Sequence, residues 1–237
     1  MFGVQAQGQV AGAAAIAAES VLALTPIAIK KSPLDTVSTV WSRILSSAVL
    51  GFMLSSDHLV KQTELVPAAA LGLTNLVHVA SSYESFRHLP AGQAMSILYT
   101  YPFWNLVFES VFRGQTVTAS QLGIIAGAMG GSVLMNMDSH SVAAASPTVA
   151  NPNPVWGTVM AFLMAFTESG MYTIIKSLGW TDSAKLVWVL NTGASIWLAI
   201  VSLAFVTPSK SSQTARVWSY DMLVLTAFHS ISLFSGY

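Results

Sequence analysis

Two carboxyl side chains fall inside long apolar stretches of the sequence. Glu19 lies about ten residues into the stretch 10–29, and Glu168 lies midway through 155–176. A charge at the centre of a membrane costs roughly 2.5–3.5 kcal/mol to insert, so each acid is expected to face a bundle interior or water. Two interpretations remain open. The acids bind a cationic substrate group or a coupling proton, or they are protonated and hydrogen-bond across helices for packing.

A positively charged side chain, that of Arg43, also falls inside an apolar stretch. Arg43 lies about eight residues into the apolar stretch 36–55, too deep for an unaided charge. Its side chain either reaches back toward Asp35, two turns earlier, or holds an anionic substrate. The acids Glu19 and Glu168 favour a cationic or zwitterionic substrate, whereas Arg43 favours a carboxylate or phosphate.

Two histidines also lie within apolar stretches. His78 and His229 occupy related positions in the two halves of the chain, where either a proton relay or ordinary packing explains them. We assign His78 to substrate binding, together with Asn191. No His-x-x-x-His spacing or other ligand set accompanies the histidines, so no metal site is predicted. No nucleophile arrangement or cofactor motif is present either, and the chain is not expected to be an enzyme.

Pro102 interrupts an apolar stretch that is rich in aromatic residues. It removes a helix hydrogen bond and clashes one turn back, near Leu98. Such a break frees a carbonyl toward a cavity, where Tyr99, Trp104 and Asn105 supply stacking and hydrogen bonds, or it is a tolerated kink with packed aromatics. Helical geometry allows only part of this set to line a cavity.

Charged pairs with helical spacing mark the ends of two apolar stretches. Glu84 stands three residues before Arg87 and four before His88, and Glu109 stands four before Arg113. We interpret both groups as solvated salt bridges at the membrane interface.

Three glycines at four-residue spacing, Gly123, Gly127 and Gly131, indicate close helix packing. The partner helix belongs to the same chain or to a second copy, so a homodimer is possible.

The amino-acid composition indicates that lipid, rather than water, surrounds most of this protein. Of 237 residues, 53% are hydrophobic and 8% are charged, whereas a soluble domain carries roughly 25% charged residues. The mean hydropathy is +0.60. Lipid must therefore cover most of the surface. The net charge of zero gives no basic balance for nucleic-acid binding. There is no cysteine, so no disulfide or thiolate site exists.

The apolar stretches predict an all-α, polytopic transmembrane bundle of about eight spans, each of about twenty residues. The predicted spans are 10–29, 36–55, 66–86, 91–112, 117–136, 155–176, 184–206 and 217–236. The segment 138–154, rich in Ser, Ala, Asn and Pro, is predicted to be a linker between a five-helix unit, 1–137, and a three-helix unit, 155–237.

The two units share a short sequence pattern. Residues 35–41, DTVSTVW, match 182–188, DSAKLVW, and a Glu-Ser pair precedes each. With five spans in the first unit, a second copy would be inserted upside down. The second copy would then lack two spans, and we expect a full molecule to have two more after Tyr237.

Several motifs in register resemble the EamA-like drug/metabolite transporter superfamily. They are Leu89-Pro90-Ala91, Tyr101-Pro102, Gly114 followed by Thr118 and Gln121, and the opening Thr25-Pro26, Lys30, Ser32-Pro33-Leu34 and Arg43. The resemblance implies ten helices in two inverted five-helix repeats, a central cavity, and export or exchange of small metabolites. The chain departs from the family at Gln115, where an acid is usual, and at Leu190, which aligns with Arg43.

From these observations we expect a multi-pass integral membrane protein that moves a small polar metabolite by alternating access. The sequence leaves the host membrane open. The alternative is a membrane scaffold or degenerate remnant that does not transport, with the glycine-spaced helix mediating assembly. Small-molecule substrate and lipid are the expected partners, without nucleic acid.

Overall fold

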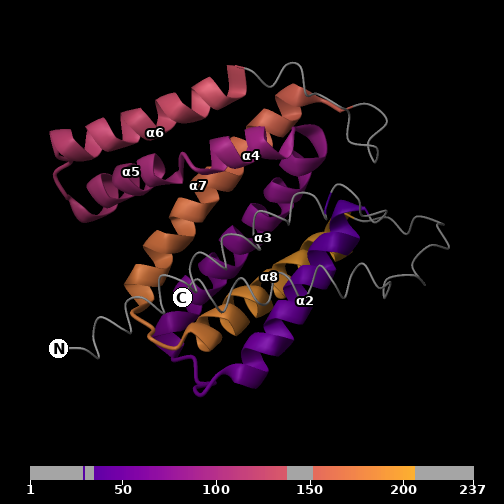
Figure 1. Ribbon diagram of the computed structural model, residues 1–237. Helices are drawn as coiled ribbons and strands as arrows, with labels where there is room; N and C mark the ends of the chain where they lie inside the picture. The colour runs from indigo at the N-terminus through magenta and orange to yellow at the C-terminus, as the bar shows by residue number, and fades with distance from the viewer. Residues whose placement is uncertain (1–28, 30–34, 138–151, 206–237) are drawn as a thin grey trace, which may run out of the picture.

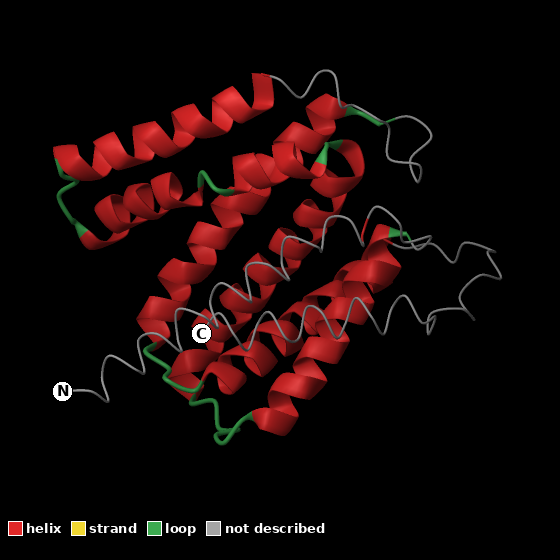
Figure 2. Cartoon of the chain, in the orientation of Figure 1, coloured by secondary structure: helices red, strands yellow, loops and turns green. Residues whose placement is uncertain are grey.

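The computed structural model describes residue 29 and residues 35–137 and 152–205, and these residues form helices without any strand (Figures 1 and 2). The helices are α2 (Thr36–Leu54), α3 (Leu65–His88), α4 (Ala91–Leu98), α5 (Tyr101–Arg113), α6 (Ala119–Met137), α7 (Pro154–Leu178) and α8 (Ser183–Phe205), with a single 3-10 turn, Gln62–Glu64, before α3. The prediction of an all-α bundle is confirmed. The predicted spans 10–29 and 217–236 lie outside the described residues, apart from Ile29.

Local sequence sets where the long helices begin and end. Asp35 caps α2, because its Oδ1 accepts the Ser38 N–H at 2.6 Å. Asn153 caps α7 in the same way, through the Trp156 N–H at 3.1 Å. Gly179 ends α7 in the left-handed conformation, φ 61°, which glycine adopts at little steric cost.

The predicted span 91–112 is divided into α4 and α5. α4 ends at Leu98, one turn before Pro102, as the missing N–H and the ring of proline predict. Thr100 closes the junction, since both its N–H and its hydroxyl donate to the Ile97 carbonyl, at 3.0 and 2.7 Å. Pro102 then stands in the first turn of α5, where an N–H is not required.

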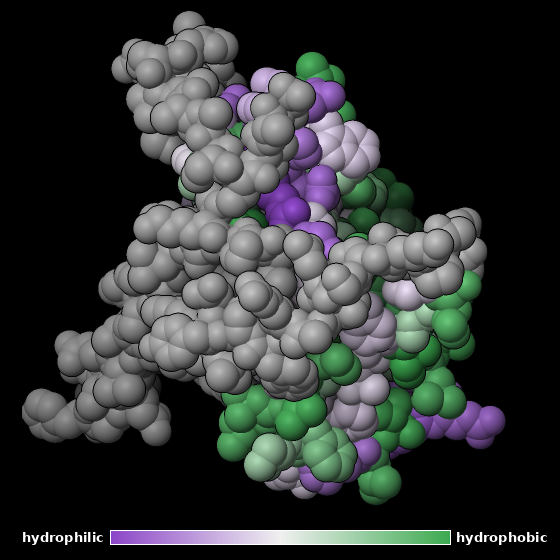
Figure 3. Space-filling view, turned by 90° about the vertical axis from the view of Figure 1, so that its right-hand side faces the viewer, coloured by the Kyte–Doolittle hydropathy of each residue, from purple (hydrophilic) through white to green (hydrophobic). Residues whose placement is uncertain are grey.

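Within the residues that the structure describes, four helices are long and apolar enough to cross a membrane: Thr36–Leu54, Gln62–His88, Pro154–Leu178 and Ser183–Leu203. They carry large apolar side chains on the outside, such as Met53, Val66 and Leu203, of which 74%, 79% and 89% are exposed. Figure 3 shows apolar side chains over much of the visible described surface, with hydrophilic ones above and below. A surface of this kind needs lipid as its solvent, so the chain is an integral membrane protein.

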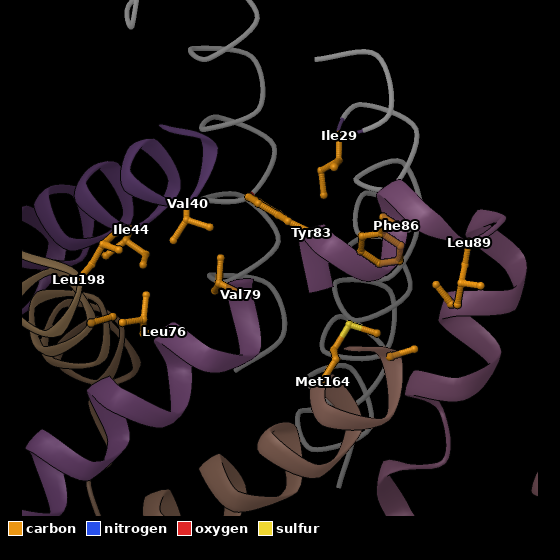
Figure 4. Packing of buried hydrophobic residues seen from close by; sticks show 13 residues of the cluster. Ile29, Val40, Ile44, Leu76, Val79, Tyr83, Phe86, Leu89, Met164 and Leu198 are labelled. Carbon is orange, nitrogen blue, oxygen red and sulfur yellow. The ribbon is translucent and has the colours of Figure 1, made fainter. Parts of the chain in front are cut away.

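α3 is the central helix, because it packs against both α7 and α8, while α2 packs on α8 (Figure 1). α4 and α5 lie against α7, and α6 contacts α4. The main hydrophobic cluster joins the four long helices (Figure 4). Its members include Val40 and Ile44 from α2, Leu76, Val79 and Tyr83 from α3, Met164 from α7 and Leu198 from α8.

Glycines bring α3 and α8 into backbone contact. A Cβ on Gly72 would lie 2.5 Å from the carbonyl carbon of Gly193. By contrast, Cβ atoms on Gly123, Gly127 and Gly131 would meet nothing within 4 Å. The described part of the chain therefore offers no close-packed partner to this face of α6, and packing against a second copy stays a prediction.

Candidate functional site

His78 of α3 and Glu168 of α7 meet inside the bundle. Nδ1 of His78 lies 3.4 Å from Oε2 of Glu168 and 3.1 Å from the carbonyl oxygen of Met164. A carbonyl oxygen can only accept, so we place a proton on Nδ1 of His78, which donates to the Met164 carbonyl with the Glu168 carboxyl group beside it. The side chains are 12% and 22% exposed. The result is a partly accessible carboxylate next to an imidazole, a pair that can exchange a proton or bind a charged group.

Arg43 of α2 faces α3 beyond His78. Its guanidinium carbon is 5.9 Å from the ring centroid of Tyr83, a buried residue five positions after His78. The alternative in which Arg43 reaches back to Asp35 is not what the structure shows. Asp35 caps α2, and no ion pair of Arg43 is found among the described residues.

The break between α4 and α5 brings a tyrosine pair toward the same face of α7. The rings of Tyr101 and Tyr172 stack with centroids 5.9 Å apart, and the Ser169 hydroxyl donates to the Tyr101 carbonyl at 2.7 Å. Tyr172 follows Glu168 by one helical turn, so the two side chains share a face. Sequence reasoning omitted Tyr172 and Tyr83. Four-residue spacing from Glu168 was the signal available for Tyr172.

The other aromatic candidates are placed differently. Trp104 packs edge-on against Phe103 and Phe166, with centroids 5.3 and 5.5 Å away. Phe166 stands two residues before Glu168, hence on another face of α7. Tyr99 is 47% exposed, and Asn105 is partly buried on α5. The structure therefore brings Tyr101, but not Trp104, to the Glu168 face.

Asn191 of α8 is buried and hydrogen-bonded. It accepts from Nδ2 of Asn75 at 3.2 Å and donates to the Val187 carbonyl at 2.8 Å. Asn75 stands three residues before His78, so this amide pair extends the polar interior from α3 to α8. Glu19 and His229 lie outside the described residues. Those residues also contain no cluster of three or more acidic, histidine or cysteine side chains able to hold a metal.

Comparison with known proteins decides the family. The model of the EamA-like transporter family matches residues 10–137, more than half of the chain. The chain belongs to the EamA-like transporter family. The sequence resemblance is thereby confirmed, and the family is one of transporters rather than enzymes.

A solved crystal structure shares the fold of this EamA-like chain. Its TM-score is 0.55 at 14% identity, covering 94% of this chain and 80% of the other. At that identity the likeness concerns the fold alone. No curated protein matches the chain.

Polar clusters lie near the ends of this EamA-like bundle as well. Glu84 accepts a hydrogen bond from the Thr36 hydroxyl of α2 and one from Nε1 of Trp156 of α7, and its Oε2 lies 3.5 Å from Nε2 of His88. Nδ1 of His88 accepts the Asn153 N–H at 3.0 Å. The predicted Glu84–His88 pair is present, and it also ties three helices together.

Glu109 has partners on two helices. Its Oε2 lies 3.7 Å from the Arg113 guanidinium, the pair expected from spacing, and its Oε1 accepts from Nζ of Lys176 of α7 at 2.6 Å. The Lys176 contact fastens α5 to α7.

Proposed function

We propose that this EamA-like protein is a secondary transporter that moves a small polar metabolite by alternating access, and that the substrate binds at His78, Glu168 and Arg43. The observation that carries the proposal is the His78–Glu168 contact within a bundle of membrane-length helices. Groups of this kind at membrane depth mark substrate or ion pathways.

The arrangement supports binding of a molecule that carries charge. Among the described residues, Glu168 has one ion-pair partner, His78, and the Glu168 side chain is 22% exposed. A cationic or proton-bearing group can replace His78 as partner of the carboxylate. Arg43 has no ion pair among the described residues. Its guanidinium N–H groups can donate two parallel hydrogen bonds to a carboxylate or phosphate of the same substrate molecule. The Tyr101–Tyr172 stack supplies an apolar wall beside the carboxylate.

The experiment is self-exchange in proteoliposomes. The purified full chain is reconstituted and loaded with labelled metabolites from four charge classes: cations, zwitterions, carboxylates and phosphates. We expect exchange of at least one class, and about a tenfold or greater loss in Glu168→Gln and in His78→Gln, a loss of about 1.4 kcal/mol in transition-state stabilisation.

Glu109→Gln is the matched control, because Glu109 is also an acid within the bundle but pairs with Lys176 and Arg113 instead. Its exchange should stay close to that of the unchanged protein, provided that gel filtration shows equal folding. Exchange that survives both Glu168→Gln and His78→Gln would remove the site from the transport path.

A further inference from the structure

Two turns from different halves of the chain meet at one end of the bundle. One turn, residues 55–61, joins α2 to α3, and the other, residues 179–182, joins α7 to α8. In Figure 1 both lie at the lower end, opposite the start of α7. Contacts between these turns therefore connect segments on either side of residues 138–151.

A lysine at the start of α8 is enclosed by the other turn. Nζ of Lys185 lies 2.6 Å from Oδ2 of Asp57, donates to the Leu59 carbonyl, and sits 4.9 Å from the ring centroid of Trp180. The Lys185 side chain is 6% exposed, whereas that of Asp57 is 50% exposed. An ammonium group removed from water in this way depends on its partners, so the turns separate only when Lys185 is rehydrated.

Asp182 makes a second connection between the turns. Its Oδ1 accepts the N–H groups of Ala184 and Lys185 and so caps α8, while its Oδ2 accepts the Ser55 hydroxyl at 3.0 Å and both the N–H and hydroxyl of Ser56 at 3.1 Å. Burial alone would raise the pKa of Asp182, but these hydrogen bonds hold that pKa well below its usual range. The carboxylate therefore stays charged while the turns are in contact.

Backbone packing closes the space directly behind the turns. A Cβ on Gly51 of α2 would lie 2.7 Å from the backbone nitrogen of Trp188 of α8. The Phe52 ring stacks on His58 at 4.3 Å and meets Trp188 edge-on at 5.9 Å. Such close approach leaves no room for a solute to pass between α2 and α8 at this end.

The ion pair has no counterpart at the equivalent position of the first half. Asp35 and Asp182 occupy matching places in the sequence pattern, and both cap a helix. Ser38, however, stands where Lys185 would align. The Asp57–Lys185 pair therefore belongs to one end of the described bundle and is not repeated at the aligned position Ser38.

We propose that the Asp57–Lys185 ion pair, together with the hydrogen bonds from Ser55 and Ser56 to Asp182, is a gate that closes this end of the transport path and opens once in each cycle. The proposal rests on the proposed transport function. It assigns to these residues control over which side of the membrane reaches Glu168.

The absence of cysteine from the chain allows a direct test. Glu168→Cys provides a single reporter thiol, whose labelling by a membrane-impermeant maleimide is measured from each side of oriented proteoliposomes. Adding Asp57→Asn removes the charge that faces Lys185 from a half-exposed position. The gate side is the side of the membrane on which residues 55–61 and 179–182 lie. Labelling from that side should be about fivefold or more faster with Asp57→Asn than without it, the lower end of typical couplings between sites.

Asp35→Asn is the matched control, because Asp35 also caps a helix but pairs with no lysine among the described residues. It should leave labelling from the gate side unchanged. Thermal unfolding of each variant establishes that it is folded, and Lys185→Gln gives the same charge loss from the other partner. Equal labelling with and without Asp57→Asn and Lys185→Gln would overturn the gate.

A cross-link separates this proposal from the proposed function. In Asp57→Cys combined with Lys185→Cys, a short, reducible bifunctional thiol reagent should stop metabolite exchange, and a reductant should restore it. Exchange that continues in the cross-linked protein overturns the gate and leaves transport standing. Labelling that responds to Asp57→Asn in a protein that exchanges no metabolite supports the gate and overturns the transport function.

Discussion

Replacing Gly72 with alanine should destabilise the bundle at the crossing of α3 and α8. The added methyl group would lie 2.5 and 2.6 Å from the carbonyl carbon and Cα of Gly193 and 2.8 Å from the nitrogen of Ala194. Overpacking a core costs typically about 1–3 kcal/mol, and the upper value applies because backbone atoms cannot rotate away. Alanine recovers about 1 kcal/mol of helix propensity. The net loss of unfolding free energy is about 2 kcal/mol.

The assay is thermal unfolding of the purified protein in detergent, followed by the fluorescence of its seven tryptophans. For a chain of this size, about 2 kcal/mol lowers Tm by roughly 4–8 °C. Two controls carry the same substitution. Gly127→Ala meets nothing within 4 Å, and Gly170→Ala meets Thr74 at an ordinary 3.5 Å. A Tm for Gly72→Ala that matches these controls would refute the backbone contact between α3 and α8.

Two further predictions concern the helix-capping acids. Asp35→Ala removes one helix cap and should lower the free energy of unfolding by about 1 kcal/mol. Asp182→Ala removes a cap and also the hydrogen bonds from Ser55 and Ser56, so it should lower the free energy of unfolding by about 2 kcal/mol. Equal losses of the two variants in thermal unfolding would contradict this difference. Hydrogen bonding from Lys185 lowers the pKa of Asp57 below its ordinary 3.8, and hydrogen bonds from the backbone and from Ser55 and Ser56 lower the pKa of Asp182 as well. Both carboxylates therefore stabilise the folded protein fully at pH values well above 3.8. This stabilisation is lost as the pH falls below 3.8. Tm measured from pH 7 to pH 3 should decline less in Asp182→Asn than in the unchanged protein, and an equal decline would contradict the assignment.

The long helices were predictable because each is a long apolar run with clear punctuation. The predicted spans 36–55 and 155–176 became Thr36–Leu54 and Pro154–Leu178, with Asp35, Asn153 and Gly179 at their ends. Hydrophobicity over about twenty residues and the chemistry of caps and turns are local properties. The break before Pro102 was predictable for the same reason.

The contacts between helices were less accessible to sequence reasoning. The evenly spaced glycines of α6 gave the strongest packing pattern, yet the structure places close contact at Gly72 and Gly193, single glycines whose meeting depends on how α3 and α8 cross. The same limit applies to Arg43. Spacing along α2 left Asp35 and an anionic substrate open as its partner, whereas the fold places the ring of Tyr83 of α3 next to it.

The sequence predicted which residues belong to the candidate site, but it did not predict that His78 and Glu168 contact each other. The insertion cost of charge singled out Glu168, and position within an apolar stretch singled out His78. Their contact follows from the packing of α3 against α7, which the sequence pattern did not specify. The tyrosine stack next to Glu168 depends in addition on the α4–α5 break.

The central claim is that Glu168 lies on a path that opens to both sides of the membrane. The most direct measurement labels Glu168→Cys, in the otherwise cysteine-free chain, with an impermeant maleimide applied from one side of oriented proteoliposomes and then from the other. Ile196→Cys is the control, because Ile196 is 57% exposed on the apolar surface of α8, where lipid excludes the reagent. The account predicts labelling of Glu168→Cys from each side and of Ile196→Cys from neither. Labelling of Glu168→Cys from one side alone, or from neither, would contradict it.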